Sequence, residues 1–279
     1  MNITSNEKIN AAMSKDKTSL KNKKLWLLDM DGTIFIDNDL ISGALDMLSQ
    51  IKENGGRYVF MSNNSSKSVD DYIKKLSGMG IEVDRDSFYI SSQAAAKYIK
   101  TNYPGKKVYC MGTQSLVSEL KRENINVYTE NTGDIDIVLL GYDTELNYKK
   151  LVDICQIMQP DTVYIATNPD FVCPAKPRFL PDCGAMSRML EYALHRLPKF
   201  LGKPHEYMID DLMEKFHYSK EETVIVGDRL YTDIACAKNS NIESVCVLSG
   251  EATICDIIES DIVADYIVES VKDIYKNIQ

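Results

Sequence analysis

Two aspartates, Asp29 and Asp31, follow directly on an apolar run in the stretch LWLLDMDGTIF. The run Leu25–Leu28 predicts a central strand of a parallel sheet, because such strands are apolar on both faces. Side chains alternate along a strand, so the two carboxylates are expected to point to the same side. Like charges at this spacing repel each other, and a neighbouring cation is the usual remedy. The pair therefore indicates a metal-assisted site, although an Asp-Gly turn at Asp31 would explain the second acid alone.

A second pair of acids follows another apolar run. Asp228 and Asp233 lie in the segment GDRLYTD, directly after the run Thr223–Val226. An acid at a strand end and an acid in the first turn of the next helix can face the same edge of a sheet, where open parallel sheets bind their ligands. Acids also favour helix N-termini through the helix dipole, which would explain each of them separately.

Two further segments could bind an anion. Ser62, Asn63 and Asn64 belong to the segment MSNNSS, which ends one predicted strand and opens a helix. Hydroxyls and unpaired backbone N–H groups at a helix start bind anions, although simple N-capping favours the same residue types. Lys203 precedes Pro204, a residue type suited to the first turn of a helix, and would project from the loop before it. A lone lysine is usually a solvated charge, so the prediction depends on all four segments occurring together.

Strands and helices alternate along most of the chain, which is typical of parallel α/β sheets. Breaks at TNYPG and at Leu197–Pro198 divide the pattern. We predict a disordered tail over residues 1–22, a doubly wound, Rossmann-like core over 23–100 and 198–279, and an inserted α/β cap domain over 101–197. Strands are expected at 25–28, 57–61, 88–91, 108–111, 135–140, 163–167, 223–226 and 244–248. Helices are expected at 44–53, 69–76, 93–100, 115–122, 148–158, 185–195, from 204 onward and at 232–239.

The composition disfavours several classes of protein. A net charge of −9 over 279 residues disfavours nucleic-acid binding, because acidic chains repel phosphate backbones. No apolar run approaches the ~20 residues needed to cross a membrane, and the polar N-terminus lacks a signal-peptide core. Seven cysteines without a CxxC pair disfavour a disulfide framework or zinc site and fit a reducing cytoplasm. The segment CPAKPR is one residue too short for a thiol-phosphatase loop.

In this order, the four segments resemble the haloacid dehalogenase (HAD) superfamily. More narrowly, they resemble the branch with a large α/β cap, which includes 4-nitrophenyl phosphatases, phosphoglycolate and pyridoxal phosphatases and the NagD-like proteins. The resemblance covers nearly the whole chain from residue 25 and includes ATNPD at 166–170 and PDCG at 181–184. It implies the HAD fold and a Mg²⁺-dependent phosphomonoester hydrolase that acts on small phosphorylated metabolites. Dehalogenating members lack an acid at the position of Asp31, so its presence favours phosphoryl transfer.

The resemblance also implies a role for each candidate residue. Asp29 would be the nucleophile that forms an aspartyl-phosphate, and Asp31 would be the general acid and base. The ligands of Mg²⁺ would be oxygen atoms of Asp29, Asp31 (through its backbone carbonyl) and Asp228, with Asp233 in support. The phosphoryl oxygens would be bound by Ser62, Asn63, Asn64 and Lys203.

A loop in the insert is expected to contact the leaving group, as the corresponding loop does in related enzymes. It contains Cys173, Lys176 and Arg178. Two basic side chains in an acidic protein could bind an anionic leaving group such as a sugar acid, but a solvated loop is an equally good interpretation. Relatives specific for pyridoxal phosphate have a histidine near the position of Cys173, so that substrate is not supported. By analogy, the cap could also pair two copies of the chain into a homodimer.

Two other classes of function share features with this pattern. A phosphorylation-dependent receiver also uses an acidic cluster, a hydroxyl and a lysine, but it is much shorter and lacks the acid two residues after its phosphorylated aspartate. A non-catalytic binding protein on the same fold would be expected to have lost Asp29 or Asp31, and both are present. Release of phosphate from 4-nitrophenyl phosphate with Mg²⁺ would distinguish the enzyme from both.

Overall fold

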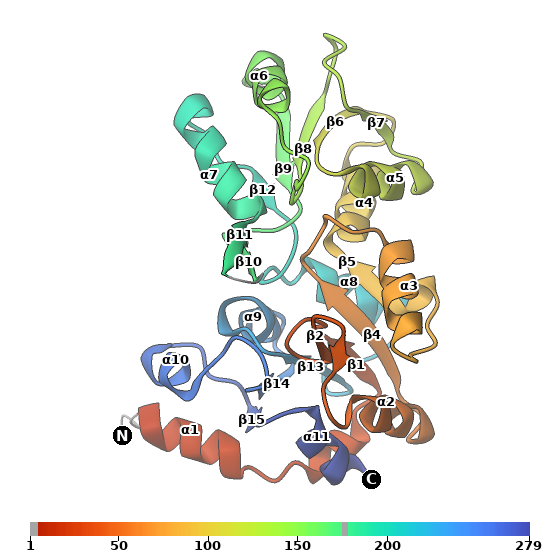
Figure 1. Cartoon of the computed structure of the whole chain (residues 1–279), viewed down its shortest axis with the longest axis vertical. Coiled ribbons are helices and arrows are strands. Elements are labelled where there is room, and N and C mark those ends of the chain that lie inside the picture. Colours follow the sequence, from red (N-terminus) through yellow and green to blue (C-terminus); the bar gives the residue numbers. More distant parts are fainter. Residues whose placement is uncertain (1–4, 175–177) are drawn as a thin grey trace. The chain divides into compact units, whose positions relative to one another are not determined.

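The computed structural model describes residues 5–174 and 178–279, which form two compact units (Figure 1). The core unit comprises the described residues up to Met61 together with Ile73–Tyr89 and Lys203–Gln279. The insert unit comprises Ser62–Tyr72 and Ile90–Gly202. Among the described residues, no helix is both long enough and apolar enough to cross a membrane.

A six-stranded sheet forms the centre of the core unit, in the order β15-β14-β13-β1-β4-β5. Its strands are β1 (Leu25–Leu28), β4 (Arg57–Ser62), β5 (Phe88–Ile90), β13 (Thr223–Gly227), β14 (Glu243–Val247) and β15 (Tyr266–Val268). Strand β1 pairs in parallel with both β13 and β4. The strand order reverses beside β1, so right-handed crossovers place helices on both faces of the sheet. All four residues of β1 are buried, as expected for a strand covered on both sides.

The helices of the core unit present apolar stripes to this sheet. Besides the N-terminal helix described below, they are α2 (Ala44–Glu53), the C-terminal part of α3 (Val69–Gly78), α8 (Tyr207–Phe216), α9 (Ala235–Ser240), α10 (Ile254–Glu259) and α11 (Val271–Ile278). In α2, the buried residues are Ala44, Met47, Leu48 and Ile51, which is the spacing of one helix face. Helix α2 packs beside α11 (Figure 1), and α8 contacts α9. A short antiparallel hairpin, β2 (Phe35–Ile36) and β3 (Asp39–Leu40), follows β1.

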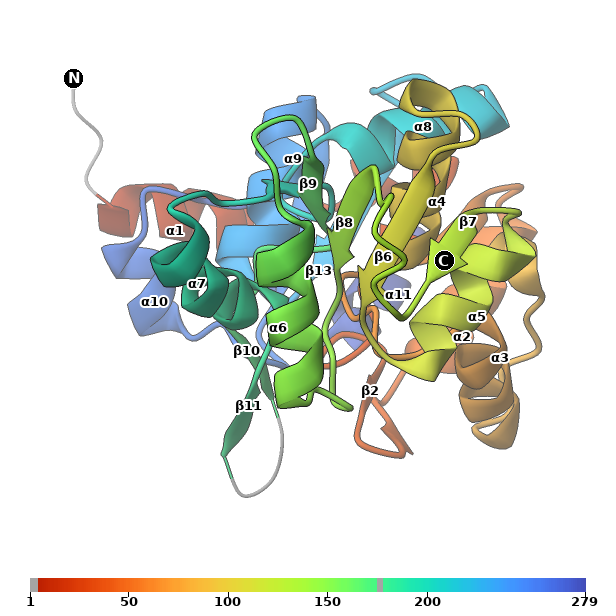
Figure 2. The same ribbon diagram turned by 90° about the horizontal axis from the view of Figure 1, so that it is seen from above.

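The insert unit contains a second parallel sheet, in the order β12-β9-β8-β6-β7. Its strands are β6 (Lys107–Met111), β7 (Asn126–Tyr128), β8 (Ile137–Leu140), β9 (Val163–Ala166) and β12 (Lys199–Phe200). Its helices are α4 (Ser91–Asn102), α5 (Gln114–Arg122), α6 (Tyr148–Ile157) and α7 (Cys183–Leu194). Alternate residues of these strands enter two apolar clusters, one with α4 and α5 and the other with α6 and α7 (Figure 2). An antiparallel hairpin, β10 (Val172–Pro174) and β11 (Phe179–Pro181), precedes α7.

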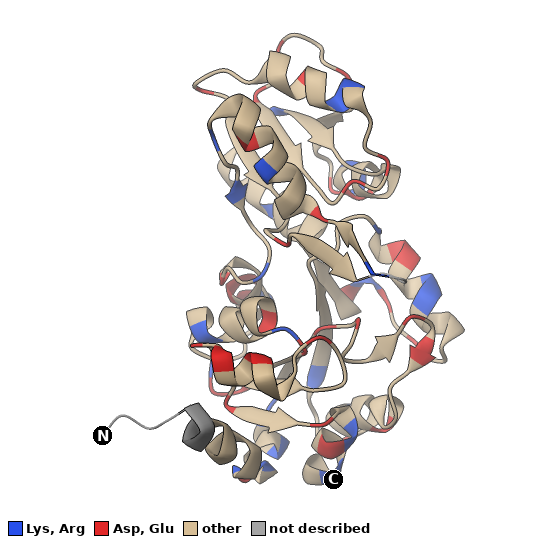
Figure 3. Cartoon of the chain, turned by 60° about the vertical axis from the view of Figure 1, so that its left-hand side comes forward, with Lys and Arg blue, Asp and Glu red and all other residues tan. Residues whose placement is uncertain are grey.

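The predicted α/β class with parallel sheets is confirmed. The eight predicted strands all occur, with ends that differ by at most two residues, and α2 has the predicted bounds. The charged residues lie mainly on helices and loops (Figure 3), so the apolar runs of the long strands stand out in the sequence. The strands that were not predicted, β2, β3, β7, β10, β11, β12 and β15, contain only two or three residues each. The helix expected from Pro204 begins instead at Tyr207.

The boundaries of the two units differ from the predicted ones. Helix α4 was assigned to the core, but Ala95, Ala96 and Ile99 pack into an apolar cluster of the insert. The TNYPG break is therefore a loop inside the insert unit. The second boundary lies between Gly202 and Lys203 rather than at residue 198. A turn signal marks where an element ends, whereas the extent of a unit depends on which side chains pack together.

The prediction of a disordered tail over residues 1–22 is wrong for the part of it that the structure describes. Residues Ser5–Ser14 form α1, and Thr18–Asn22 form a 3₁₀ turn. Helix α1 contacts α10 and β15 (Figure 1). Its buried residues Ile9 and Ala12 join the apolar cluster that contains Ile257. A segment this polar shows too few apolar residues for the helical pattern to be evident from sequence.

Replacing Ile9 with aspartate tests whether α1 is packed in solution. Ile9 is 4% exposed, so Ile9→Asp should lower the free energy of unfolding by about 1–3 kcal/mol, the value of burying one large aliphatic side chain. The loss in the free energy of unfolding stays in this range because α1 can detach from the core unit instead of burying the new charge. The measurement is urea unfolding followed by circular dichroism.

The exposed neighbour Asn10 provides the matched control, since Asn10→Asp adds the same charge one residue away. That variant should unfold like the wild type. Equal stability of both variants and the wild type would mean that α1 is not packed on the core unit.

Candidate active site

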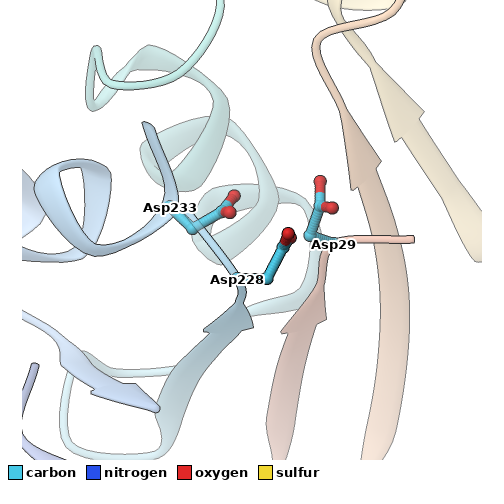
Figure 4. A group of neighbouring side chains, drawn as sticks. All are labelled: Asp29, Asp228 and Asp233. Carbon is cyan, nitrogen blue, oxygen red and sulfur yellow. The ribbon is translucent and has the colours of Figure 1, made fainter. Parts of the chain in front are cut away.

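Three carboxyl groups converge at one edge of the core sheet. Asp29 follows β1 and Asp228 follows β13, and these two strands are parallel neighbours, so their carboxyl ends meet. Asp233 lies in the π-helical turn Leu230–Ile234 that comes next, an irregularity found frequently at functional sites. One carboxylate oxygen of each residue lies within 4.8 Å of the others, and Figure 4 shows the three groups directed toward one another. The structure thus brings together three of the residues predicted from sequence.

Lys203 links two of these carboxylates. Its Nζ atom lies 2.6 Å from Asp29 Oδ1 and 2.6 Å from Asp233 Oδ1, and it also donates to the carbonyl of Met61 at 3.2 Å. The lysine side chain is 3% exposed and that of Asp233 is fully buried. Burial alone would lower the pKa of Lys203, but the charges of Asp233 and Asp29 outweigh it and raise the pKa. Lys203 is therefore a permanent buried cation of the site.

The Asp228 carboxylate is held by the backbone around it. The N–H of Glu251 donates to Oδ2 at 2.7 Å, and the Thr33 hydroxyl lies 3.4 Å from Oδ1. A Cβ atom on Gly32, which has a φ of +84°, or on Gly250 would lie only 2.4 Å or 2.0 Å from Oδ2. Glycine is therefore required at both positions. Burial, and then the charges of Asp29 and Asp233, raise the pKa of Asp228 to about 7.

Two more charged residues belong to this site and were not predicted. The backbone N–H of Arg229 donates to Asp233 Oδ2 at 3.2 Å, and its Nε lies 2.9 Å from Glu251 Oε2. Burial raises the pKa of Asp233 to about 6, although Lys203 opposes the shift. The Ser-Gly pair that precedes Glu251, one residue after the end of β14, could have identified this loop, because such pairs mark turns and the turn lies at the same edge of the sheet.

Asp31 lies outside the group of three converging carboxylates. Its side chain is 50% exposed, and Lys75 Nζ lies 3.7 Å from its Oδ1. Desolvation raises the pKa of Asp31, Lys75 opposes this shift, and the charge of Asp29 adds to it. Met30, which separates the two acids of the motif, is fully buried. The two carboxylates that the sequence pairs therefore have different environments, one against a buried lysine and one near solvent.

The predicted anion-binding loop, which belongs to the insert unit, is held by hydrogen bonds. Ser62 ends β4, and its hydroxyl accepts a hydrogen bond from the N–H of Asn64 at 3.1 Å. The Asn64 side chain in turn accepts from the N–H of Ser66 at 2.9 Å. Ser62 and Asn63 are buried. Phosphoryl binding by Ser62, Asn63 and Asn64 stays a prediction.

The ATNPD motif fixes this loop. The Asn63 amide donates to both carboxylate oxygens of Asp170 at 3.2 Å. The carbonyl of Asn63 accepts from the Asn168 amide and from the Ser91 hydroxyl, each at 2.7 Å. Asp170 is 4% exposed, so its charge depends on such donors. The motif noted in the sequence thus has a structural role that spacing alone did not reveal.

The remaining candidates lie in and beside the β10–β11 hairpin. Cys173 is partly buried in β10, and Arg178 is exposed just before β11. Lys176 lies outside the described residues. Asp182 of the PDCG motif caps α7, where its carboxylate accepts from the N–H of Cys183. Substrate binding by Cys173, Lys176 and Arg178 stays a prediction.

The chain is similar to known proteins over most of its length. The chain matches a family model described as haloacid dehalogenase-like hydrolase over residues 26–126 and a HAD-hydrolase-like model over residues 200–274. It is 32% identical to the 4-nitrophenylphosphatase of Schizosaccharomyces pombe, over 88% of this chain and 91% of that protein. The crystal structure of a 4-nitrophenylphosphatase from Thermotoga maritima superposes with a TM-score of 0.89 at 34% identity, covering 94% of this chain and 99% of that chain. A glycerol phosphate phosphatase from Mycobacterium tuberculosis, solved in complex with magnesium, superposes with a TM-score of 0.85 at 25% identity, covering 92% and 78%.

The raised pKa values predict that the metal-free protein loses stability as pH rises. Asp228 and Asp233 hold protons up to about pH 7 and about pH 6 in the folded state, whereas an unfolded carboxyl group releases its proton near pH 4. This stabilisation is complete below about pH 4 and is lost as pH rises through the folded pKa values. Urea unfolding in EDTA should give a free energy a few kcal/mol lower at pH 8 than at pH 5.

Removing one of the titrating groups isolates their contribution. Asp228→Asn should reduce the difference in the free energy of unfolding between pH 5 and pH 8. Asp161→Asn, at an exposed position, should leave this difference as in the wild type. An Asp228→Asn protein with the full wild-type pH dependence would contradict the assignment of the shift to this carboxyl group.

Proposed function

The chain belongs to the haloacid dehalogenase-like hydrolases and is a phosphatase of that family, and we propose that it hydrolyses small phosphomonoesters with Mg²⁺ through an aspartyl-phosphate. The observation that carries this proposal is the convergence of Asp29, Asp228 and Asp233 around Lys203 at the carboxyl edge of the sheet. Ligands of doubly wound sheets bind at this edge, where the strand order reverses.

The charges of the site favour a divalent cation. The carboxylates of Asp29, Asp228, Asp233 and Glu251 contribute four negative charges when ionised, and Lys203 and Arg229 contribute two positive charges, which leaves two negative charges uncompensated. Mg²⁺ prefers oxygen ligands about 2.1 Å away, so two opposite ligands lie about 4.2 Å apart. One carboxylate oxygen each of Asp29, Asp228 and Asp233, all three within 4.8 Å of one another, fits this requirement. Bound there, Mg²⁺ would neutralise charge on the nucleophile and the phosphoryl group.

In the first step, a carboxylate oxygen of Asp29 attacks phosphorus and the bond from phosphorus to the leaving oxygen breaks. Asp31 donates its proton to that oxygen. Two observations support these roles: Asp29 is paired with a buried lysine at the strand end, and Asp31 is half-exposed with a raised pKa. A carboxyl group with a raised pKa is a better proton donor near neutral pH.

In the second step, the Asp31 carboxylate accepts a proton from water, which attacks the phosphorus of the aspartyl-phosphate. Inorganic phosphate leaves, Asp29 regains its carboxylate, and Asp31 is protonated again for the next turnover. Lys203 stabilises the negative charge that spreads over the phosphoryl oxygens. We assign the remaining phosphoryl contacts to Ser62, Asn63 and Asn64, whose loop is held by hydrogen bonds within it and to Asp170.

The metal requirement and the nucleophile are tested by one set of assays. Release of 4-nitrophenol from 4-nitrophenyl phosphate should cease in excess EDTA and return when Mg²⁺ is added. Asp29→Asn should abolish turnover with or without Mg²⁺, because a neutral amide is a poor nucleophile, while its circular dichroism spectrum stays that of the wild type. Full activity of the metal-stripped protein would refute the role of Mg²⁺. A kcat of Asp29→Asn close to that of the wild type would refute the nucleophile.

Arg178 is proposed to select substrates by the charge of their leaving group. Arg178→Ala should lower kcat/KM for phosphate esters whose leaving group carries a carboxylate or a second phosphate, by an amount worth about 1–3 kcal/mol. The leaving group of 4-nitrophenyl phosphate carries no such charge, so kcat/KM for this substrate should change little. Equal losses for both kinds of substrate would indicate a role in folding. No loss for either would make Arg178 an ordinary surface charge.

A further inference from the structure

Lys75 lies beside the proposed general acid, and the proposed chemistry gives it no role. It belongs to the part of α3 in the core unit, and its side chain is 30% exposed. Its Nζ atom lies 3.7 Å from Asp31 Oδ1 and also 3.7 Å from the centroid of the Phe35 ring. The ammonium group thus contacts a carboxylate and an aromatic face at the same time.

Both partners of Lys75 belong to one tight turn. The carbonyl of Met30 accepts from the N–H groups of Ile34 at 2.8 Å and Phe35 at 3.2 Å, and the N–H of Gly32 donates to the carbonyl of Phe35 at 2.8 Å. The Phe35 ring is fully buried, so it provides a fixed surface. A lysine seated over an aromatic face at this distance is held by the ring quadrupole. The turn therefore fixes the position of the ammonium group relative to the Asp31 backbone.

The Asp31 carboxylate needs a restraint on its outer side. It is half-exposed, and the charge of Asp29 repels it when both are ionised. The charges of Lys75 and Arg229 oppose this repulsion, and the Lys75 ammonium group is in direct contact with the carboxylate. Ion pairs as exposed as this one contribute little to folding stability, so the contact is better explained by a role in orienting the acid than by a role in folding.

We propose that Lys75 is a positioning residue, whose ammonium group, seated on Phe35, holds the Asp31 carboxyl group in the orientation from which it protonates the leaving oxygen. This inference rests on the proposed function of Asp31 as the general acid. Phenolate is a poor leaving group and needs that proton, whereas 4-nitrophenolate is a stable anion that departs without it. The contribution of Lys75 should therefore grow as the leaving group becomes more basic.

The test compares kcat/KM for phenyl phosphate and 4-nitrophenyl phosphate, two substrates of similar shape. This parameter covers the steps up to departure of the leaving group, so the later attack of water does not enter. Lys75→Met removes the charge and keeps the apolar stem. It should reduce kcat/KM for phenyl phosphate on the order of tenfold, a part of the 10²–10⁴-fold that a general acid supplies, with a much smaller reduction for 4-nitrophenyl phosphate.

Two matched variants complete the comparison. Lys75→Arg keeps a cation over the ring and should restore most of the activity toward phenyl phosphate. Lys74→Met removes a charge from the exposed neighbouring position and should behave as the wild type toward both substrates. Equal losses for the two substrates in Lys75→Met, or no loss for either, would overturn the inference.

Asp31→Asn separates the failure of this inference from the failure of the proposed function. If Asp31→Asn discriminates strongly between the two substrates and Lys75→Met does not, Asp31 is the general acid and Lys75 does not position it. If Asp31→Asn shows no such discrimination, the role of Asp31 as general acid is wrong and the inference about Lys75 is overturned with it. The inference also predicts that the double variant, Asp31→Asn with Lys75→Met, has a kcat/KM for phenyl phosphate no lower than that of Asp31→Asn alone.

Discussion

The mutual repulsion of Asp29, Asp228 and Asp233 is the constraint on which the rest of the site depends. One carboxylate oxygen of each residue lies within 4.8 Å of the others, and two of the three side chains are buried. Their negative charge must therefore be compensated locally or removed by protonation. Lys203 compensates part of it through two contacts of 2.6 Å. The N–H groups of Glu251 and Arg229 donate to the carboxylates, and glycines allow the backbone to approach Asp228. The negative charge that is left favours a divalent cation.

The positions of Asp29 and Asp228 at one edge of the sheet could be predicted from sequence because a largely apolar run precedes each of them. The run Leu25–Leu28 and the run before Asp228 both read as buried strands, and in a parallel sheet their ends meet. Lys203 could not be placed by this reasoning alone, since nothing in its surroundings distinguishes a buried lysine from a solvated one. Its pairing with Asp29 and Asp233 depends on the turn after Gly202, which no local pattern encodes.

Other parts of the structure depend on contacts between segments that are distant in the sequence, and local sequence patterns did not predict them. Among the described side chains of α1, Ile9 and Ala12 are buried, but the polar composition of the helix resembled that of a disordered tail. The assignment of α4 to the insert unit depends on where Ala95 and Ile99 pack. Similarly, the hydrogen bonds from Asn63 to Asp170 join residues 107 positions apart. Each of these features depends on which side chains pack together in the folded protein. The spacing of apolar residues along the sequence does not show this.

The central claim of this account is that Asp29, Asp228 and Asp233 form a single site for a divalent cation. Calorimetric titration of Mg²⁺ into the metal-free protein tests it most directly, because it measures binding without any turnover. The account predicts that one Mg²⁺ ion binds per chain and that Asp228→Asn weakens this binding strongly while the protein stays folded. Absence of Mg²⁺ binding, or equal affinities of the wild type and Asp228→Asn, would contradict it.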